Sequence, residues 1–305
     1  MVVVSTLAAT SFTPIHMNKQ LLSPREPMQV LTEIGNMQAD IVGLRWSRFH
    51  HAVYTGTLIP GCRYCMRRSF ACMHVGQRCN LDCAFCPIAR EQRQQEDATA
   101  DAGVREADWQ AALRQHRAGP LEAASITGGE PLLYMAQVER LCADLRALNE
   151  AIHIWLYTNG SLATRERFRS LERWGVGEVR INLAASDYAD RGLAAVALAR
   201  SVFAHVAVEV PVYPSQRMAL MSALPKLEQI GIDQLNLQEL VVTPANIDRL
   251  QGRPYAMGPV HLLDGSRRLT YRVIRHCLDA GYSYTCTDCS AGLKHQLDSS
   301  TPLGY

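Results

Sequence analysis

The chain has 305 residues, of which 48% are hydrophobic and 20% charged, an ordinary composition for a globular protein with a large core. Its 31 basic and 29 acidic residues leave a formal net charge of +2, which argues against a surface for nucleic acid or membrane. No segment approaches the ~20 apolar residues that span a bilayer, and no basic residue precedes the short apolar run at the N-terminus, so we expect a cytoplasmic protein.

The predicted elements alternate between strands and helices after a weakly periodic N-terminal region. Residues 1–69 contain four prolines that interrupt the pattern, with one helix expected at 28–44. Strands are expected at 71–75, 123–127, 153–157, 179–183, 206–212 and 234–241. Helices are expected at 106–117, 135–148, 164–174, 188–204, 216–230 and 267–280, and the polar segment 90–101 is expected to be an exposed loop.

Six strands that are each followed by a helix predict an α/β fold with a parallel sheet and right-handed crossovers. Such a sheet forms a full or partial barrel or stays open, and in both cases ligands bind at the C-terminal ends of the strands. We therefore divide the chain into an N-terminal extension (1–69), a barrel core (70–265) and a C-terminal helix with a cysteine-containing tail (266–305).

Ten cysteines are unusual for a protein expected in the reducing cytoplasm, where disulfides are rare. Eight of them fall into two groups, one between residues 62 and 86 and one at residues 286 and 289, which indicates metal ligands. Cys142 and Cys277 stand alone in helical patterns and are expected in the core.

The first group ends in Cys79, Cys83 and Cys86, spaced C-x3-C-x2-C, directly after the first predicted strand. Three thiolates on one loop can each bind one iron of a cubane cluster and leave the fourth iron without a protein ligand. An open iron suits a cluster that reacts, whereas electron carriers and structural sites normally use four ligands. A zinc knuckle is the alternative, although zinc sites usually combine two pairs of C-x2-4-C.

Two further motifs follow the second and third predicted strands. The first is Gly128-Gly129-Glu130-Pro131, in which glycines allow close backbone approach and Glu130 could accept hydrogen bonds from an ammonium group. The second contains Asn159 in Thr-Asn-Gly. Each motif alone is also typical of a plain turn. All three motifs nevertheless stand at the C-terminal ends of successive strands, where a parallel sheet binds its ligands.

These motifs resemble those of the radical SAM superfamily over roughly residues 72–242, with Phe85 as the aromatic residue before the last cysteine. The resemblance implies a partial (β/α)6 radical SAM barrel with N- and C-terminal extensions. It implies a [4Fe–4S] cluster on the three cysteines, and S-adenosylmethionine whose amino group meets segment 128–131. It further implies reductive cleavage to a 5′-deoxyadenosyl radical, a small-molecule or peptide substrate and a flavodoxin or ferredoxin-type reductant.

Polar residues on later strands are candidates for binding the rest of S-adenosylmethionine. They are Arg180, Asn182 and Ser186 around the fourth strand and Gln238 on the sixth. Polar residues that alternate within apolar strands can point into a barrel lumen, where a polar ligand satisfies them, and the alternative is an ordinary surface position.

The remaining clustered cysteines form two C-x2-C pairs, Cys62/Cys65 and Cys286/Cys289, which together make a four-thiolate site. Zinc or an auxiliary iron–sulfur cluster would fit this second site, Cys72 is a replacement ligand, and unligated thiols are the alternative. Some archaeal-type radical SAM proteins carry a similar G-C-x-x-C upstream of the main motif.

Three functions are consistent with these features. The first is a radical enzyme for a small molecule or a peptide side chain, and the second is an activase of a glycyl-radical enzyme. The third is a non-enzymatic zinc or iron–sulfur binding module. The near-neutral charge does not support nucleic acid as the partner of such a module.

Overall fold

The computed structural model describes residues 27–47, 53–67, 69–95, 109, 121–257 and 260–290. Its helices are α1 (Pro27–Ala39), α2 (Pro60–Arg67), α3 (Arg90–Gln95), α5 (Met135–Leu148), α6 (Arg165–Arg173), α7 (Asp190–Arg200), α8 (Arg217–Ile230) and α9 (Ser266–Asp279). Its strands are β1 (Arg45–Trp46), β2 (Val53–Tyr54), β3 (Phe70–His74), β4 (Ala123–Thr127), β5 (His153–Thr158), β6 (Val176–Ile181), β7 (His205–Val212), β8 (Gln234–Glu239), β9 (Val241–Val242), β10 (Pro254–Met257), β11 (Val260–Leu263) and β12 (Thr285–Asp288).

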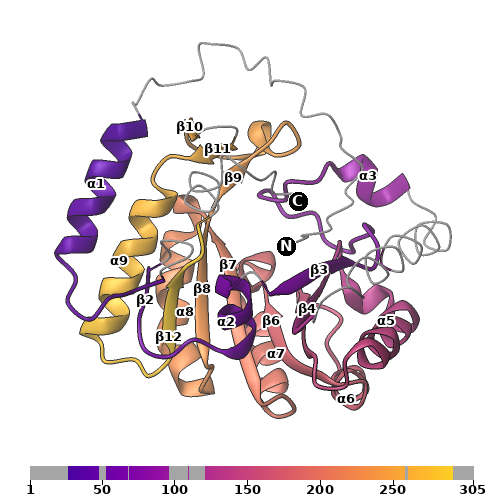
Figure 1. Cartoon of the computed structure of the whole chain (residues 1–305). Coiled ribbons are helices and arrows are strands. Elements are labelled where there is room, and N and C mark those ends of the chain that lie inside the picture. The colour runs from indigo at the N-terminus through magenta and orange to yellow at the C-terminus, as the bar shows by residue number, and fades with distance from the viewer. Residues whose placement is uncertain are drawn as a thin grey trace.

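One curved sheet organises the part of the chain that the structure describes, with strand order β1-β2-β12-β8-β7-β6-β5-β4-β3. All pairings from β3 through β8 to β12 are parallel, and β2 joins β12 antiparallel. A smaller antiparallel sheet of β10, β11 and β9 lies beyond the C-terminal ends of the long strands (Figure 1). This is a partial barrel of α/β type.

The sheet is covered by helices on its outer face, while α2 crosses its concave face (Figure 1). The alternation of side chains along β8 shows how the two faces differ. Leu235 and Leu237 are fully buried on the outer side, whereas Gln234 and Asn236 point inward and bond to one another at 2.6 Å. The barrel therefore has an apolar outer core and a polar lumen.

Local signals in the sequence start and end several helices. The hydroxyl of Thr164 accepts a hydrogen bond from the backbone N–H of Arg167 at 3.2 Å, which caps the start of α6. Helix α8 ends at Gly231, whose φ of 76° is the left-handed conformation that glycine adopts without strain. These ends return the chain to the sheet after each crossover.

The six predicted strands are confirmed, although β6 begins three residues before the predicted start at 179. The sheet also contains a seventh parallel strand, β12, in what we predicted as a tail. The prediction of a loop at 90–101 is wrong for residues 90–95, which form α3. The guanidinium of Arg93 holds this helix in place by donating to the carbonyl oxygens of Leu81 and Ile88. The predicted helix at 106–117 lies outside the described residues except for the buried Trp109.

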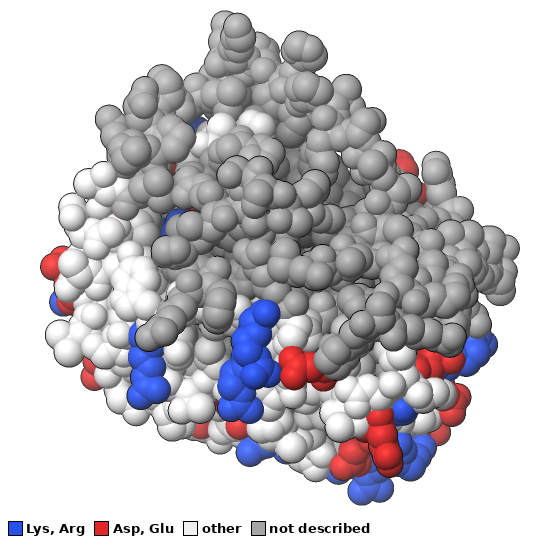
Figure 2. All heavy atoms as spheres, viewed as in Figure 1, with Lys and Arg blue, Asp and Glu red and all other residues white. Residues whose placement is uncertain are grey.

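None of the helices in the described ranges is long and apolar enough to span a bilayer. On the visible face in Figure 2, basic and acidic side chains of the described residues are interspersed along the lower part. The compartment, the exclusion of nucleic acid and the domain limits at residues 69 and 265 stay predictions.

Candidate active site

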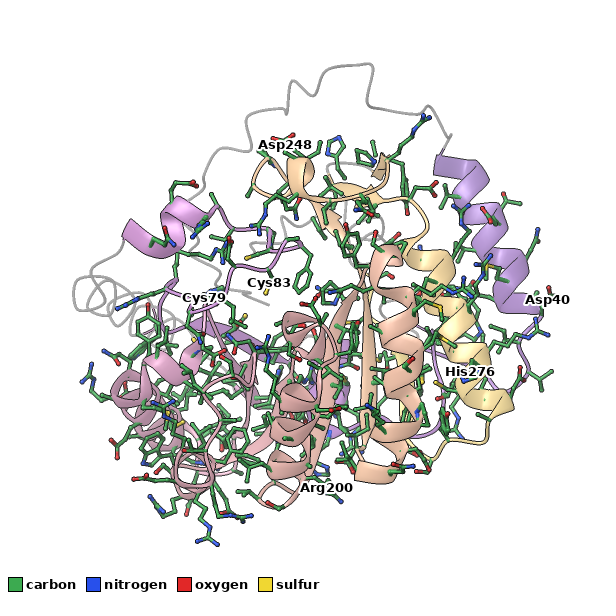
Figure 3. The ribbon with its side chains drawn as sticks, turned by 180° about the vertical axis from the view of Figure 1, so that it is seen from behind. Asp40, Cys79, Cys83, Arg200, Asp248 and His276 are labelled. Carbon is green, nitrogen blue, oxygen red and sulfur yellow. The ribbon has the colours of Figure 1, made fainter. Side chains whose placement is uncertain are left out.

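The three-cysteine loop follows β3 at the C-terminal end of the barrel. Figure 3 shows Cys79 and Cys83 on this loop, on the side of the molecule where Asp248 lies and away from Arg200 at the end of α7. The N–H of Cys86 donates to the carbonyl of Cys83 at 3.1 Å, so the last two cysteines share a tight turn. Phe85 between them is buried, and its carbonyl accepts a hydrogen bond from Asn246 at 3.1 Å.

The thiols in this loop affect one another's ionisation. Burial raises the pKa of Cys83 to about 12, and the neighbouring thiols of Cys79 and Cys86 add to the increase. Burial also raises the pKa of Cys79. Loss of all three protons requires a compensating positive charge, which iron supplies when it binds thiolates.

The motif Gly128-Gly129 packs against the segment that leads into the cysteine loop. The N–H of Gly129 donates to the carbonyl of Gly76 at 2.9 Å. A Cβ atom at Gly129 would lie 2.2 Å from the carbonyl oxygens of Gln77 and Arg78, and one at Gly128 would lie 2.1 Å from that of Gly76. Both glycines are therefore required by the close approach of two backbone segments.

The carboxylate of Glu130 is fully buried and accepts three hydrogen bonds from the protein. Its donors are the hydroxyl of Thr158 at 2.7 Å, the N–H of Asn159 at 2.7 Å and the N–H of Leu132 at 3.0 Å. Burial raises the pKa of Glu130, and these three hydrogen bonds oppose the increase. Through these hydrogen bonds the carboxylate joins the C-terminal ends of β4 and β5. Its contact with a ligand ammonium group stays a prediction. Pro131 follows as the buried first residue of a short 3-10 helix, Pro131–Leu133.

Asn159 connects the end of β5 to the cysteine loop. Its amide nitrogen donates to Oδ1 of Asn80 at 3.0 Å and lies 3.7 Å from the sulfur of Cys79. Ser161 completes the contact, since the amide of Asn80 donates to its hydroxyl at 2.8 Å. The first and third motifs are therefore in direct contact.

The remaining candidates occupy three different environments. Asn182 and Ser186 bond within the turn that follows β6, since Asn182 accepts from the N–H of Ala185 at 3.3 Å and Ser186 donates to the carbonyl of Leu183 at 2.9 Å. Gln238 is half-buried near the end of β8. Arg180 is buried deep in the lumen, paired with Glu178 at 2.7 Å, and so lies below the motif residues. In this structure the side chains of Asn182 and Ser186 stabilise the turn after β6.

The turn after β6 also contains two residues that the sequence did not single out. Asp187 and Tyr188 have positive φ angles of 53° and 59°, a conformation that non-glycine residues seldom adopt. Asp187 is close enough to Cys83 to raise the pKa of that thiol, and the hydroxyl of Tyr188 is buried without a hydrogen-bond partner. Backbone strain of this kind gathers at functional sites. No composition or spacing signal could have revealed it.

The structure corrects the predicted four-thiolate site. Cys286 faces the outer side of β12, where its thiol interacts with that of Cys277 on α9. Cys62 instead faces the lumen, where Gln234 donates to its sulfur at 2.9 Å. Because side chains alternate along a strand, Cys286 points away from the other thiols of the predicted set. Cys142 and Cys277 are buried in the core, as predicted.

Comparison with known proteins identifies a family domain in the part of the chain that contains these motifs. Residues 73–202 match the family model of the radical SAM superfamily. This segment, residues 73–202, is a radical SAM domain by its match to the family model. Enzymes of this superfamily use a [4Fe–4S] cluster and S-adenosylmethionine, and the three thiols on one loop fit the sulfur ligands that such a cluster requires.

Individual relatives are distant from this chain in sequence. MJ0021 of Methanocaldococcus jannaschii, provisionally named a glycyl-radical enzyme activating enzyme, is 21% identical over 205 residues, which cover 65% of the chain and 54% of MJ0021. SuiB of Streptococcus suis bound to S-adenosylmethionine has 18% identity and a TM-score of 0.53, over 72% of the chain and 50% of SuiB. SuiB bound to its precursor peptide SuiA has 15% identity and a TM-score of 0.52, over 85% of the chain and 60% of SuiB. The chain thus spans about half the length of these relatives, and SuiB shows the fold alone.

Proposed function

We propose that this radical SAM protein binds a [4Fe–4S] cluster through Cys79, Cys83 and Cys86 and cleaves S-adenosylmethionine reductively. When bound, the reduced cluster supplies the electron that breaks the C5′–S bond and yields a 5′-deoxyadenosyl radical, which abstracts hydrogen from a substrate. The proposal depends above all on one observation: three sequence motifs from three successive parallel strands meet at one end of the barrel.

The residues around the loop have separate parts in this proposal. Gly128 and Gly129 hold the backbone of segment 128–131 against the cysteine loop, which leaves their peptide groups as the contacts for the amino group of the methionine moiety. Asn159 directs its amide toward the sulfur of Cys79, where an N–H group stabilises thiolate charge. Gln238, half-buried near the end of β8, is a contact for the nucleoside.

We propose a peptide or protein substrate rather than a free metabolite. The name of MJ0021 supports a protein glycyl residue as the target, and the peptide complex of SuiB supports a peptide. An electron donor of the flavodoxin or ferredoxin type would reduce the cluster. A small-molecule substrate is the second candidate.

Anaerobic reconstitution with iron and sulfide tests the proposal. The reconstituted chain should release 5′-deoxyadenosine and methionine from S-adenosylmethionine when dithionite is added, as measured by liquid chromatography. Cys83→Ala should abolish this release, while Cys142→Ala, a matched change in a buried helix, should leave it intact. Bound zinc without cleavage would favour the non-enzymatic module.

A further inference from the structure

The floor of the barrel lumen is formed by α2, which carries two thiols. Three contacts fix the helix against inward-facing side chains: the N–H of Gly61 donates to Glu178 at 2.8 Å, the N–H of Ile59 donates to Gln234 at 3.0 Å, and Gln234 donates to the sulfur of Cys62 at 2.9 Å. Cys62 is only 5% exposed. Cys65 follows one helical turn later, so both thiols lie on one face of α2.

A third thiol reaches the same region from β12. Thr287 pairs in register with Asn236 of β8, whose amide lies 3.7 Å from the sulfur of Cys62. Cys289 stands two residues after Thr287, and its N–H continues the ladder by donating to Leu237 at 2.9 Å. Because side chains repeat every second residue, Cys289 faces the lumen.

Helix spacing and strand register place these thiols on the inner side of the sheet. Cys62 and Cys65 are three residues apart in α2, and Asn236 links Cys62 to the β12 register that Cys289 continues. The three thiols thus come from the floor and one wall of the lumen, on the inner side of the sheet.

Two buried polar groups beside these thiols lack a hydrogen-bond partner. Arg180 is 2% exposed, and its guanidinium is held by Glu178 at 2.7 Å and Tyr157 at 3.0 Å, yet its Nη2 has no acceptor. A Cβ atom built on Gly61, the neighbour of Cys62, would lie 2.6 Å from that Nη2. The hydroxyl of Thr287 is also unpartnered. A buried N–H group that no protein acceptor satisfies can donate to a group bound in the lumen.

From this geometry we propose that Cys62, Cys65 and Cys289 bind a second iron–sulfur cluster in the lumen, with Nη2 of Arg180 donating to its sulfur atoms. A cluster fits better than a single ion, because no three Cys, His, Asp or Glu side chains among the described residues converge on one metal position. In a cluster each thiolate binds a different iron, so the sulfurs stay apart. The inference does not depend on cleavage of S-adenosylmethionine at the first cluster.

Iron counting on the full-length chain, reconstituted anaerobically, tests this inference. The wild-type chain should bind about eight irons, and a variant with Cys79, Cys83 and Cys86 all changed to Ala should retain about four. This triple variant isolates the proposed second cluster, so its iron content is informative whether or not the first cluster cleaves S-adenosylmethionine. Loss of all iron in that variant, or zinc in place of iron, would overturn the proposal.

Single substitutions then test the ligand set in the variant that lacks the loop cysteines. Cys62→Ser and Cys289→Ser should each lose most of the remaining iron, whereas Cys286→Ser, three positions earlier and facing α9, should keep it. Iron loss in the Cys286→Ser protein with retention in Cys289→Ser would contradict the assignment. Arg180→Gln should lower the reduction potential of the remaining cluster, because a positive charge next to it is removed; an unchanged potential would exclude the proposed hydrogen bond.

Discussion

Asp82 and Arg249, which are 167 residues apart in sequence, form an ion pair of 2.8 Å that joins the cysteine loop to the far side of the barrel opening. Asp82 lies between Cys79 and Cys83, so this contact acts on the loop that would bind the cluster. Arg93 of α3 donates to the same carboxylate at 2.9 Å. The hydrogen bond from Arg93 is the main reason why the pKa of Asp82 is lowered.

Asp82→Ala is expected to destabilise the folded chain more than Arg249→Ala does. Arg93 is 3% exposed and loses a charged partner in the first variant, which costs roughly 2 kcal/mol. Arg249 is more than a third exposed, so its pair contributes at most about 1 kcal/mol. Urea unfolding measures the free energy of unfolding of both variants. Lys226→Ala, which removes an exposed ion pair, is the control. Equal losses of unfolding free energy in the two variants would contradict the larger contribution of the Arg93–Asp82 pair.

Gly129→Ala should disrupt the active site through backbone displacement. The new Cβ atom would lie 2.2 Å from two carbonyl oxygens, and the resulting shift should cost roughly 2–3 kcal/mol in unfolding free energy. The cysteine loop would move with it, so we expect cleavage of S-adenosylmethionine to fall as well. Gly35→Ala is the control, because a Cβ atom there meets nothing within 4 Å in α1. Retained cleavage in the Gly129 variant would show that this contact tolerates displacement.

Glu130→Gln should separate the ends of β4 and β5. The substitution places an amide NH2 group opposite at least one of the three donors that the carboxylate now satisfies, at a cost of roughly 1–3 kcal/mol. Glu122→Gln, at an exposed position before β4, should change stability by less than about 0.5 kcal/mol. Thermal unfolding compares the Glu130→Gln and Glu122→Gln variants. Similar midpoint temperatures would mean that the buried hydrogen bonds of Glu130 contribute little to stability.

The stability of the chain should respond to pH through Glu239. Burial raises the pKa of Glu239 from 4.5 to about 7, while Arg267 and a hydrogen bond from Tyr255 at 2.5 Å oppose the increase. Between these values the folded chain keeps a proton that the unfolded chain has released, so stability falls as pH rises, by roughly 3 kcal/mol in total. Glu239→Gln should remove this contribution in urea unfolding at a series of pH values. An identical pH dependence in both proteins would place the pKa of Glu239 near its ordinary value.

The strands of the barrel were predictable where the sequence contains an apolar run bounded by turn residues. The segment Ala123–Thr127 is confirmed at both ends. The start of β6 was missed because Gly177 and Glu178 interrupt the run, and Glu178 is stabilised there by Arg180 and by His153 at 3.1 Å. Such partners come from the tertiary structure, so no local pattern could reveal them.

The motifs of the site were predictable from the sequence, but the directions in which some of the side chains point were not. The spacing of the cysteines placed the loop correctly, and strand order brought Asn159 to it. The orientation of Cys286 was not predictable, because β12 is only four residues long and the C-x2-C spacing favoured a metal-binding interpretation. The hydrogen bonds that Glu130 makes to the chain were not predictable, because two of its donors, Thr158 and Asn159, come from the end of another strand.

The open iron of the loop cluster is the central claim, and spectroscopy on the reduced, reconstituted chain tests it most directly. Electron–nuclear double resonance with S-adenosylmethionine labelled by 17O in its carboxylate should show a hyperfine coupling between the label and the cluster. The coupling should persist in the Cys289→Ser variant and disappear with Cys83→Ala. A wild-type cluster that shows no coupling to the bound label would mean that the fourth iron is closed, and would contradict the proposed chemistry.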